Sequence, residues 1–347
     1  MIKEAIQTVV EGKSLSLDEA AQVMEEIMGG QVTPSQFGAF VTALRIKGET
    51  VEELAGLART MRAKAVRVTG SGPVVDTCGT GGDGATTFNV STTAAFIVAG
   101  AGLKVAKHGN RAMSSKSGSA DVLEALGVKI ELTAQQVEKC LDEVGIGFMF
   151  APSFHPSMKY ASAPRKEIGI RTVFNILGPL TNPAGASAQV IGVPAEQFGH
   201  KMASALGLLG TKHALIVHGL SGIDELSITS RSRIWELRKD TIVDYYVSPE
   251  DFGYEKAELK AIQGGTAAEN AGILRAVLGG EKSPRRHMAV MNAAAAIMAG
   301  SGNGNSNSLG GARSLVACAK KAEQAIDNGA AMEKLERLIA VTREFAT

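Results

Sequence analysis

A glycine-rich stretch at residues 76–83, with the sequence DTCGTGGD, carries the first residues that could do chemistry. It follows the apolar pair Val74-Val75, and the turn after a strand is where α/β sheets bind ligands. Glycine adopts left-handed conformations that gather backbone N–H groups into one concavity, which binds phosphate. The stretch lacks the Gly-Lys-Ser/Thr ending of a nucleoside-triphosphate loop and the spacing of a dinucleotide fingerprint. It predicts a phosphate-binding turn, with a plain structural turn as the alternative.

Two more polar connections follow along the chain. Residues 89–92 (NVST) precede an apolar helix expected at residues 93–99, so free N–H groups and hydroxyls would lie at a helix N-terminus, which attracts anions. Residues 107–119 follow a short apolar run and include the cations Lys107 and Arg111 beside several serines. An ordinary helix cap and a solvated basic loop are the alternatives. Two such connections at one sheet edge favour a ligand that carries a diphosphate and a terminal phosphate.

His108 and a pair of carboxylates are further candidates for chemistry. An unperturbed imidazole titrates near neutral pH, so His108 is interpreted as a general base or, equally, as a positioning residue. Asp224 and Glu225 are adjacent and suit Mg²⁺, which takes oxygen ligands and shares its shell with substrate phosphates. A plain surface pair is the alternative. The other histidines lack zinc-type spacing and are interpreted as structural: His155, His200, His213, His218 and His287.

Composition argues against several classes of protein. The 347 residues carry a formal net charge of +1 with both signs interspersed, which disfavours a nucleic-acid surface. Apolar stretches at residues 94–103 and 289–300 are shorter than the roughly 18 residues of a membrane helix, and the N-terminus lacks a signal-peptide pattern. An odd number of cysteines without metal-ligand spacing predicts reduced thiols at Cys78, Cys140 and Cys318. We expect a soluble, cytoplasmic protein without a membrane or nucleic-acid partner.

Helix signals dominate the N-terminal part of the chain. Apolar residues recur at helical spacing over residues 2–10. Capping signals at Ser16, Thr33 and Thr50, each with a Glu or Gln three residues later, open three further helices. This succession of short helices before any strand predicts an all-helical N-terminal domain at residues 1–66.

The rest of the chain alternates short apolar runs with helical stretches. This alternation is typical of an α/β domain with a mostly parallel central sheet, here expected over residues 67–347. Residues 300–311 are rich in Gly, Ser and Asn and predict a flexible loop. The apolar runs that we interpret as strands lie at residues 74–75, 103–106, 146–150 and 214–217.

Several motifs in order along the chain together resemble one enzyme family. They lie at residues 79–83, 89–92, 107–119, 148–152, 155–156, 165–172, 174–183 and 222–227. In these segments the sequence closely resembles the anthranilate phosphoribosyltransferases, of the nucleoside phosphorylase and phosphoribosyltransferase superfamily. The resemblance spans nearly the full chain and is far more specific than a single glycine loop. It implies transfer of the 5-phosphoribosyl group from phosphoribosyl diphosphate to the amine of anthranilate, with release of diphosphate. That reaction is the second step of tryptophan biosynthesis from chorismate.

The resemblance also implies roles residue by residue. Contacts with phosphoribosyl diphosphate are implied for Gly79, Gly82, Asp83, Thr87, Asn89, Val90, Ser91, Thr92, Lys107, His108, Gly109, Asn110, Arg111, Ala112, Met113, Ser114, Ser115 and Ser119. Contacts with anthranilate are implied for Gly79, Asn110 and Arg165. The implied Mg²⁺ ligands are Ser91, Asp224 and Glu225. The residues expected to contribute to catalysis are Lys107, His108, Asn110 and Arg165.

The architecture implied by the family is a small helical domain, a larger α/β domain and a cleft between them. A homodimer through the helical part is also implied. Because Arg165 would serve the acceptor, we expect the chain to return to the helical side around residues 160–185.

The chemistry of the implied substrates predicts little need for a base. The amine of anthranilate is neutral and has a free lone pair, whereas loss of diphosphate leaves oxocarbenium character that must be shielded from water. We therefore expect Lys107, backbone amides and Mg²⁺ to stabilise the diphosphate, and His108 not to be an obligatory base. A pyrimidine nucleoside phosphorylase and a non-catalytic protein that binds phosphoribosyl diphosphate or nucleic acid are the alternatives.

Overall fold

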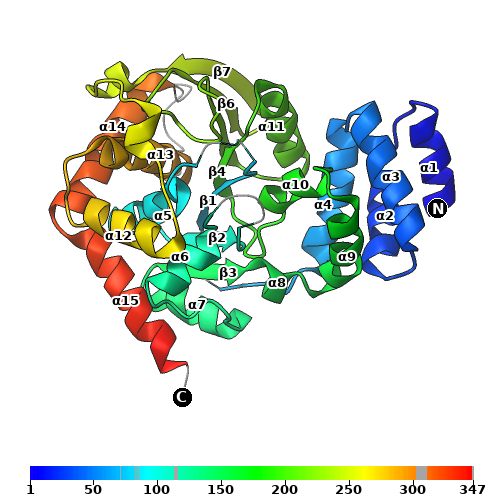
Figure 1. Cartoon of the computed structure of the whole chain (residues 1–347), viewed down its shortest axis with the longest axis horizontal. Helices are drawn as coiled ribbons and strands as arrows, with labels where there is room; N and C mark the ends of the chain where they lie inside the picture. The colour runs from blue at the N-terminus through cyan, green and yellow to red at the C-terminus, as the bar shows by residue number, and fades with distance from the viewer. Residues whose placement is uncertain (71, 83, 85, 113–115, 302–310, 346–347) are drawn as a thin grey trace.

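The computed structural model of the chain describes residues 1–70, 72–82, 84, 86–112, 116–301 and 311–345. A bundle formed mainly by the N-terminal helices lies beside a larger α/β part built on a seven-stranded sheet (Figure 1). Most of the loop expected at residues 300–311 lies outside the described residues. No helix in the described ranges is long and apolar enough to cross a membrane.

The N-terminal bundle begins its helices at the predicted capping signals. Its helices are α1 (Ile2–Val10), α2 (Leu17–Met28), α3 (Pro34–Lys47) and α4 (Val51–Lys64). The side chains of Ser16, Thr33 and Thr50 each accept a hydrogen bond from the backbone N–H three residues on, and the side chain of that residue accepts one from the cap's own N–H. These bonds satisfy N–H groups that have no partner within the helix.

Two later helices pack against this bundle. One is α9 (Lys159–Ile168), which contacts α2 and α3, and the other is the short α10 (Phe174–Leu177), which contacts α4. The ring centroid of Phe174 lies 5.3 Å from that of Phe37 in α3. The chain therefore lies beside the N-terminal helices a second time before it returns to the sheet (Figure 1).

The central sheet has the order β3-β2-β1-β4-β5-β6-β7, in which β1 to β5 are parallel and β6 and β7 are antiparallel. The strand order reverses at β1, because the chain builds β2 and β3 on one side of it and β4 and β5 on the other. A crevice opens at the carboxyl ends of strands at such a switch point. The strands are β1 Val75–Gly79, β2 Val105–Gly109, β3 Ile146–Phe150, β4 Ala188–Gly192, β5 His213–Gly219, β6 Ser232–Arg238 and β7 Thr241–Val247.

The α/β fold with a mostly parallel sheet is confirmed, but strand ends and some strands differ from the prediction. The run at residues 146–150 matches β3, whereas the sequence patterns do not reveal β4, β6 or β7. Lys107 and His108, expected in a loop, are residues of β2 and pair with β3. The strand can contain a lysine because the Lys107 ammonium donates to the carbonyl of Thr77 and the hydroxyl of Ser91.

Helices cover both faces of the sheet. Along β5, Leu215 and Val217 belong to one hydrophobic core with α5 and α13, whereas Ala214 and Ile216 belong to a second core with α11. The second core continues into the helical bundle, because α11 also packs against α4. The helices of this part are α5 Val90–Gly100, α6 Ser119–Ala125, α7 Ala134–Glu143, α8 Ala151–Phe154, α11 Gly199–Leu208, α12 Ala267–Leu278, α13 Pro284–Gly300, α14 Ala312–Asp327 and α15 Ala330–Glu344. Short 3₁₀ turns lie at Pro156–Met158, Gly178–Leu180, Glu196–Phe198, Pro249–Phe252 and Leu259–Ile262.

Glu53 does more than close the capping box of α4. Its fully buried carboxylate accepts hydrogen bonds from the N–H groups of Leu15 at 2.9 Å and Thr50 at 2.8 Å. It also forms an ion pair with the Lys47 ammonium at 2.9 Å. The carboxylate therefore joins the loop before α2 to the junction of α3 and α4.

We predict that Glu53→Gln lowers the free energy of unfolding by about 3–5 kcal/mol, because the buried Lys47 ammonium would lose its counter-charge. Chemical denaturation followed by circular dichroism measures this loss. The control is Glu19→Gln, in the exposed capping box of α2, where the solvent-exposed carboxylate has no buried ammonium as a partner and its loss should cost far less. Equal losses in the two variants would contradict a special role for the buried carboxylate.

Candidate active site

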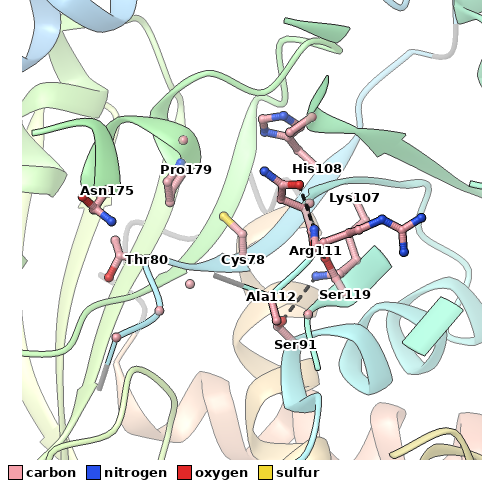
Figure 2. Close-up of a pocket in the computed structure, with 18 of the residues that line it drawn as sticks. Cys78, Thr80, Ser91, Lys107, His108, Arg111, Ala112, Ser119, Asn175 and Pro179 are labelled. Atoms are coloured by element: carbon pink, nitrogen blue, oxygen red, sulfur yellow. Dashed lines mark hydrogen bonds between the residues drawn. The ribbon is translucent and has the colours of Figure 1, made fainter. Parts of the chain in front are cut away.

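A cavity of about 600 Å³ opens at the carboxyl ends of β1 and β2, between the sheet and helices of the bundle side (Figure 2). It contains every described residue to which the sequence analysis assigns a site role. Asp83, Met113, Ser114 and Ser115 lie outside the described residues. The predicted residues that line the cavity are Gly79, Gly82, Thr87, Asn89, Val90, Ser91, Thr92, Lys107, His108, Gly109, Asn110, Arg111, Ala112, Ser119, Arg165, Asp224 and Glu225.

The glycine-rich turn after β1 is held against the loop that follows β5. The N–H of Gly81 donates to Oδ2 of Asp224 at 2.8 Å. A Cβ at Gly79 would collide with the Asp224 carboxylate, and one at Gly192 would collide with its backbone carbonyl. Gly82 has φ of +76°, a left-handed conformation that favours glycine. Glycine is needed here because the Asp224 loop approaches the ends of β1 and β4 so closely.

Lys107 is a buried cation at the floor of the cavity. Its ammonium donates to the carbonyl of Thr77 at 2.5 Å and to Oγ of Ser91 in the first turn of α5 at 3.3 Å. Burial lowers the pKa of Lys107, and the carboxylate of Asp76 opposes this shift. The ammonium and the N-terminus of α5 therefore place positive potential on the same wall, as an anion requires.

Asp76, in β1, is hydrogen-bonded to β2 and to the segment after α10. Its fully buried carboxylate accepts from the N–H of His108 at 3.2 Å and from Nδ2 of Asn182 at 2.7 Å. The same Asn182 amide donates to the carbonyl of Ala106 at 2.9 Å. Burial raises the pKa of the Asp76 carboxyl, whereas the Lys107 ammonium lowers it.

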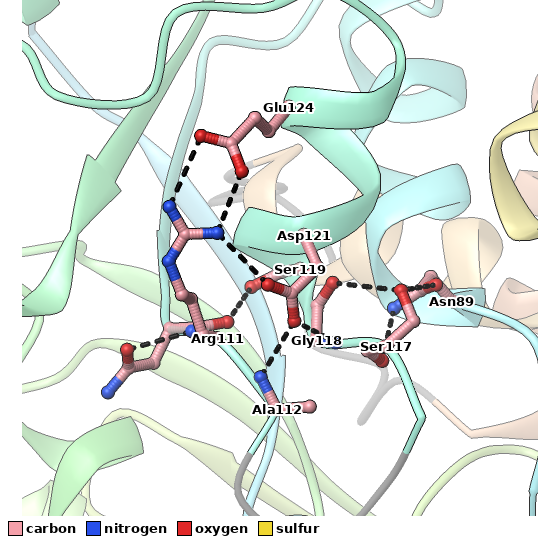
Figure 3. Close-up of polar contacts among 9 residues, drawn as sticks. Asn89, Arg111, Ala112, Ser117, Gly118, Ser119, Asp121 and Glu124 are labelled. Carbon is pink, nitrogen blue, oxygen red and sulfur yellow. Dashed lines mark hydrogen bonds and ion pairs between the residues drawn. The ribbon is translucent and has the colours of Figure 1, made fainter. Parts of the chain in front are cut away.

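The connection from β2 to α6 is organised by acids (Figure 3). The Arg111 guanidinium pairs with Glu124 at 2.8 Å and with Asp121 at 3.1 Å. Asp121 also accepts from the N–H groups of Ala112 and Gly118. We predicted from the sequence that Arg111 binds a polyanionic ligand. In this structure its guanidinium forms ion pairs with two carboxylates of the protein.

Two buried histidines face each other in the cavity wall. The ring centroids of His108 and His155 lie 5.0 Å apart. Within the described residues, Nε2 of His108 and both ring nitrogens of His155 have no hydrogen-bond partner. Burial, with a contribution from His155, lowers the pKa of His108 to about 3, and burial lowers the pKa of His155 to about 4. Both rings are therefore neutral at physiological pH.

Arg165 supplies a cation on the bundle side of the cavity. It lies in the last turn of α9, and its guanidinium lies 5.4 Å from the ring centroid of Phe174. Burial lowers the pKa of Arg165. It forms no salt bridge among the described residues, so its charge is available to a carboxylate ligand.

The donors near Asp224 suit magnesium. Asp224, Glu225 and Ser91 all line the cavity and offer only oxygen atoms, which Mg²⁺ prefers. In the part of the chain that is described, no cluster of three or more His, Cys, Asp or Glu could hold a metal. Such a set fits an ion that takes one or two carboxylates from the protein and its other ligands from water and substrate phosphates.

Sequence reasoning missed several residues of the cavity wall. His155 was interpreted as structural, and Arg171 and Asn175 received no role, although all three lie in motifs that carry the family resemblance. Met61 comes from α4 and has no recognisable signal, because a methionine at helical spacing usually indicates core packing. Cys78, Thr80, Gly81, Ser117 and Gly118 also line the cavity and lie in the two stretches predicted to bind an anion, at residues 76–83 and 107–119. The other lining residues without a predicted role are Phe88, Ala151, Pro152, Pro156, Met158, Lys159, Ser162, Phe174, Gly178, Pro179 and Thr181.

We predict that the histidine pair makes the fold sensitive to acid. In the unfolded chain each ring takes up a proton below about pH 6.5, whereas in the folded protein it does so only near pH 3 to 4. The stabilisation is therefore complete above about pH 6.5 and is lost as the pH falls, by about 1.4 kcal/mol per pH unit for each histidine. Between about pH 6.5 and pH 4.5, the free energy of unfolding measured by chemical denaturation should fall less steeply with decreasing pH for His155→Gln than for the wild type. Equal slopes would contradict the buried, neutral state of His155.

Both parts of the chain match models of known protein families. Residues 3–65 match the helical bundle domain of a glycosyl transferase family, and residues 71–332 match the a/b domain of the same family. Both parts therefore have the order and extent of one known two-part architecture.

Curated relatives and solved structures agree with this match. The anthranilate phosphoribosyltransferase of Dehalococcoides mccartyi is 56% identical over 100% of both chains, and that of Chloroflexus aggregans is 56% identical over 99% of this chain and 98% of its own. The crystal structure of the Thermus thermophilus enzyme has a TM-score of 0.89 at 42% identity and covers 98% of this chain and 99% of its own. The Saccharomyces cerevisiae enzyme in complex with PRPP and Mg has a TM-score of 0.88 at 29% identity and covers 99% and 98%. The chain belongs to the anthranilate phosphoribosyltransferase family.

Proposed function

We propose that the protein is an anthranilate phosphoribosyltransferase that requires Mg²⁺. It transfers the 5-phosphoribosyl group of phosphoribosyl diphosphate to the amine of anthranilate and releases diphosphate, the second step of tryptophan biosynthesis from chorismate. The observation that carries this proposal is one cavity with two different walls. One wall offers a buried Lys107, a helix N-terminus and a glycine turn to an anion. The other offers the Arg165 guanidinium, which lies over Phe174 and has no ion-pair partner among the residues that the structure describes. Full-length identity to enzymes of this name supports the same reading.

We assign the first wall to phosphoribosyl diphosphate and the second to anthranilate. Residues 79–92 and 107–119 hold the donor, while Gly79, Asn110 and Arg165 hold the acceptor. Ser91, Asp224 and Glu225 hold Mg²⁺, since they provide oxygen donors at the same cavity. Support for the donor and the metal comes from the yeast relative in complex with PRPP and Mg, and support for the acceptor comes from the same yeast enzyme in complex with 4-fluoroanthranilate.

The reaction follows from these positions. The amine nitrogen of anthranilate forms a bond to the anomeric carbon while the bond from that carbon to the diphosphate oxygen breaks with its electron pair. Lys107 and the backbone N–H groups of the donor wall bind the leaving diphosphate, and the walls of the cavity exclude water from the cationic ribosyl group. Bound Mg²⁺ supplies neutralising charge to the diphosphate. The nitrogen then loses one proton to the released diphosphate or to water, because a neutral His108 with a low pKa is a weak acceptor.

We also propose a division into a helical domain at residues 1–66, with a return around 160–185, and an α/β domain at 67–347. A homodimer through the helical domain is supported by exposed apolar side chains on its helices, since Val10 is 65% and Ile46 is 81% exposed. A cytoplasmic location is supported by three free cysteines, two of them buried.

We predict that anthranilate fluorescence is lost only when protein, Mg²⁺ and phosphoribosyl diphosphate are all present. Arg165→Ala should raise the KM for anthranilate about 10- to 100-fold, because a hydrogen bond to a charged group contributes about 1.5–3 kcal/mol. The neighbouring exposed residue gives a matched control, and Lys166→Ala should change the KM by less than about twofold. A chelator should stop the reaction. Donor-independent phosphorolysis of thymidine or uridine by the wild type would instead indicate a nucleoside phosphorylase.

A second prediction concerns His108. His108→Gln should lower kcat by less than about tenfold, whereas loss of a general base costs about 10²–10⁴-fold. Steady-state kinetics of the variant, with calorimetry of both substrates, measures this. A loss of about 10²-fold or more with both substrates still bound would make His108 an obligatory base after all.

A further inference from the structure

Arg171 joins the donor turn to the acceptor side of the cavity. It lies between α9 and α10, six positions after Arg165 in the sequence. Its Nη2 donates to the carbonyl of Gly81 at 2.9 Å and to that of Thr80 at 3.5 Å. The glycine turn and the segment that carries Arg165 are therefore connected directly through one guanidinium.

The turn is shaped to receive this guanidinium. A Cβ on Gly82 would overlap the Arg171 guanidinium, so a side chain there would displace the guanidinium from its present position. On its other side the turn is held by Asp224, whose carboxylate accepts from the N–H of Gly81 at 2.8 Å. The carbonyls of the turn thus accept hydrogen bonds from Arg171, in the segment between α9 and α10. One N–H group of the turn donates to Asp224, in the loop after β5.

The segment that carries Arg171 is itself fixed in place. The N–H of Thr172 donates to Oδ1 of Asn175 at 2.9 Å, which closes a turn directly after Arg171. Phe174 follows, with its ring against Phe37 of α3 on one side and the Arg165 guanidinium on the other. A displacement of the glycine turn is therefore transmitted through Arg171 to residues 171–174, and Phe174 of this segment contacts Arg165.

We infer that Arg171 is a positioning residue that ties the donor turn to the acceptor segment, so that occupation of the donor site raises the affinity for anthranilate. This inference rests on the proposed function for the identity of the two ligands. Arg171 acts through the carbonyls of Thr80 and Gly81, whose positions set the shape of the turn around the diphosphate. Coupling of this kind is reciprocal, so anthranilate must raise the affinity for the donor by the same factor.

The first experiment measures this coupling without turnover. Anthranilate binding is followed by fluorescence with and without Mg²⁺ and inorganic diphosphate, a donor-site ligand that has no ribosyl group to transfer. Wild-type protein should bind anthranilate about fivefold or more tightly when diphosphate is present, and Arg171→Gln should reduce this factor to about one. The matched control is Lys166→Gln, which removes one positive charge at an exposed position of α9 and should keep the wild-type factor. A factor of one in the wild type, or an unchanged factor in Arg171→Gln, would overturn the inference.

Steady-state kinetics separates positioning from charge and from loss of fold. Arg171→Gln should raise the KM for phosphoribosyl diphosphate about tenfold, equivalent to 1.4 kcal/mol, and change kcat by less than about twofold. Arg171→Lys keeps the charge but loses the planar fork, so its KM should rise about fivefold. A wild-type KM in Arg171→Lys would show that Arg171 contributes only its charge. A fall in kcat with unchanged KM would indicate either a smaller folded fraction or an interaction made only in the transition state. Both results would overturn the inference.

Failure of the proposed function gives a different pattern. If wild-type protein does not consume anthranilate, the assignment of the reaction fails. Calorimetric binding of Mg²⁺ and diphosphate to wild type and Arg171→Gln still tests whether Arg171 shapes the turn. Weaker diphosphate binding in the variant would support the positioning role, and equal binding would overturn it.

Discussion

The buried carboxylate of Asp76 is the constraint on which the cavity depends. It accepts hydrogen bonds from His108 and Asn182, and the Asn182 amide also donates to the carbonyl of Ala106. These bonds fix β1, β2 and the segment after α10 relative to one another. The carboxylate of Asp76 also stabilises the positive charge of the buried Lys107 ammonium. The hydrogen-bond partners of this ammonium are neutral oxygens. An ammonium without a nearby carboxylate would be costly in such an interior, so the anion-binding wall is possible because Asp76 lies beneath it.

The two walls of the cavity are built by different physical means. The wall that we propose for the donor depends on backbone approach, as at Gly79 and Gly192, where a Cβ would collide with Asp224. The acceptor wall depends on side chains, chiefly Arg165 and Phe174, which belong to helices packed on the bundle. The walls meet because the second hydrophobic core is continuous from the sheet into the bundle, so their separation is set by packing.

Local signals in the sequence predicted a large part of the fold and of the donor wall. Capping boxes are readable because their partners lie three residues apart, and Ser16, Thr33 and Thr50 begin helices as predicted. Contacts between distant segments were not readable, since Asn182 lies 106 positions from Asp76 and no pattern in either stretch identifies the other. β4 escaped prediction because Gln189 interrupts its apolar residues. β2 was predicted too short because a buried lysine is rare, and the partners that permit it cannot be read from the sequence. The roles of the individual site residues came from family resemblance, because no local pattern distinguishes a residue that binds the donor from one that binds the acceptor.

The contrast between a backbone-built and a side-chain-built wall has an evolutionary consequence. Gly192, at the end of β4 beside the glycine turn, cannot be replaced, because any side chain there would meet the main chain of Asp224, which no rotamer change relieves. The exposed side chains that α9 presents to the cavity, Lys159 and Ser162, can be exchanged one at a time without moving a strand. Descendants of such a protein can therefore acquire new acceptors through a handful of substitutions while the end of β4 stays unchanged. Directed evolution of acceptor preference should accordingly concentrate its libraries on these positions of α9 and leave Gly192 alone.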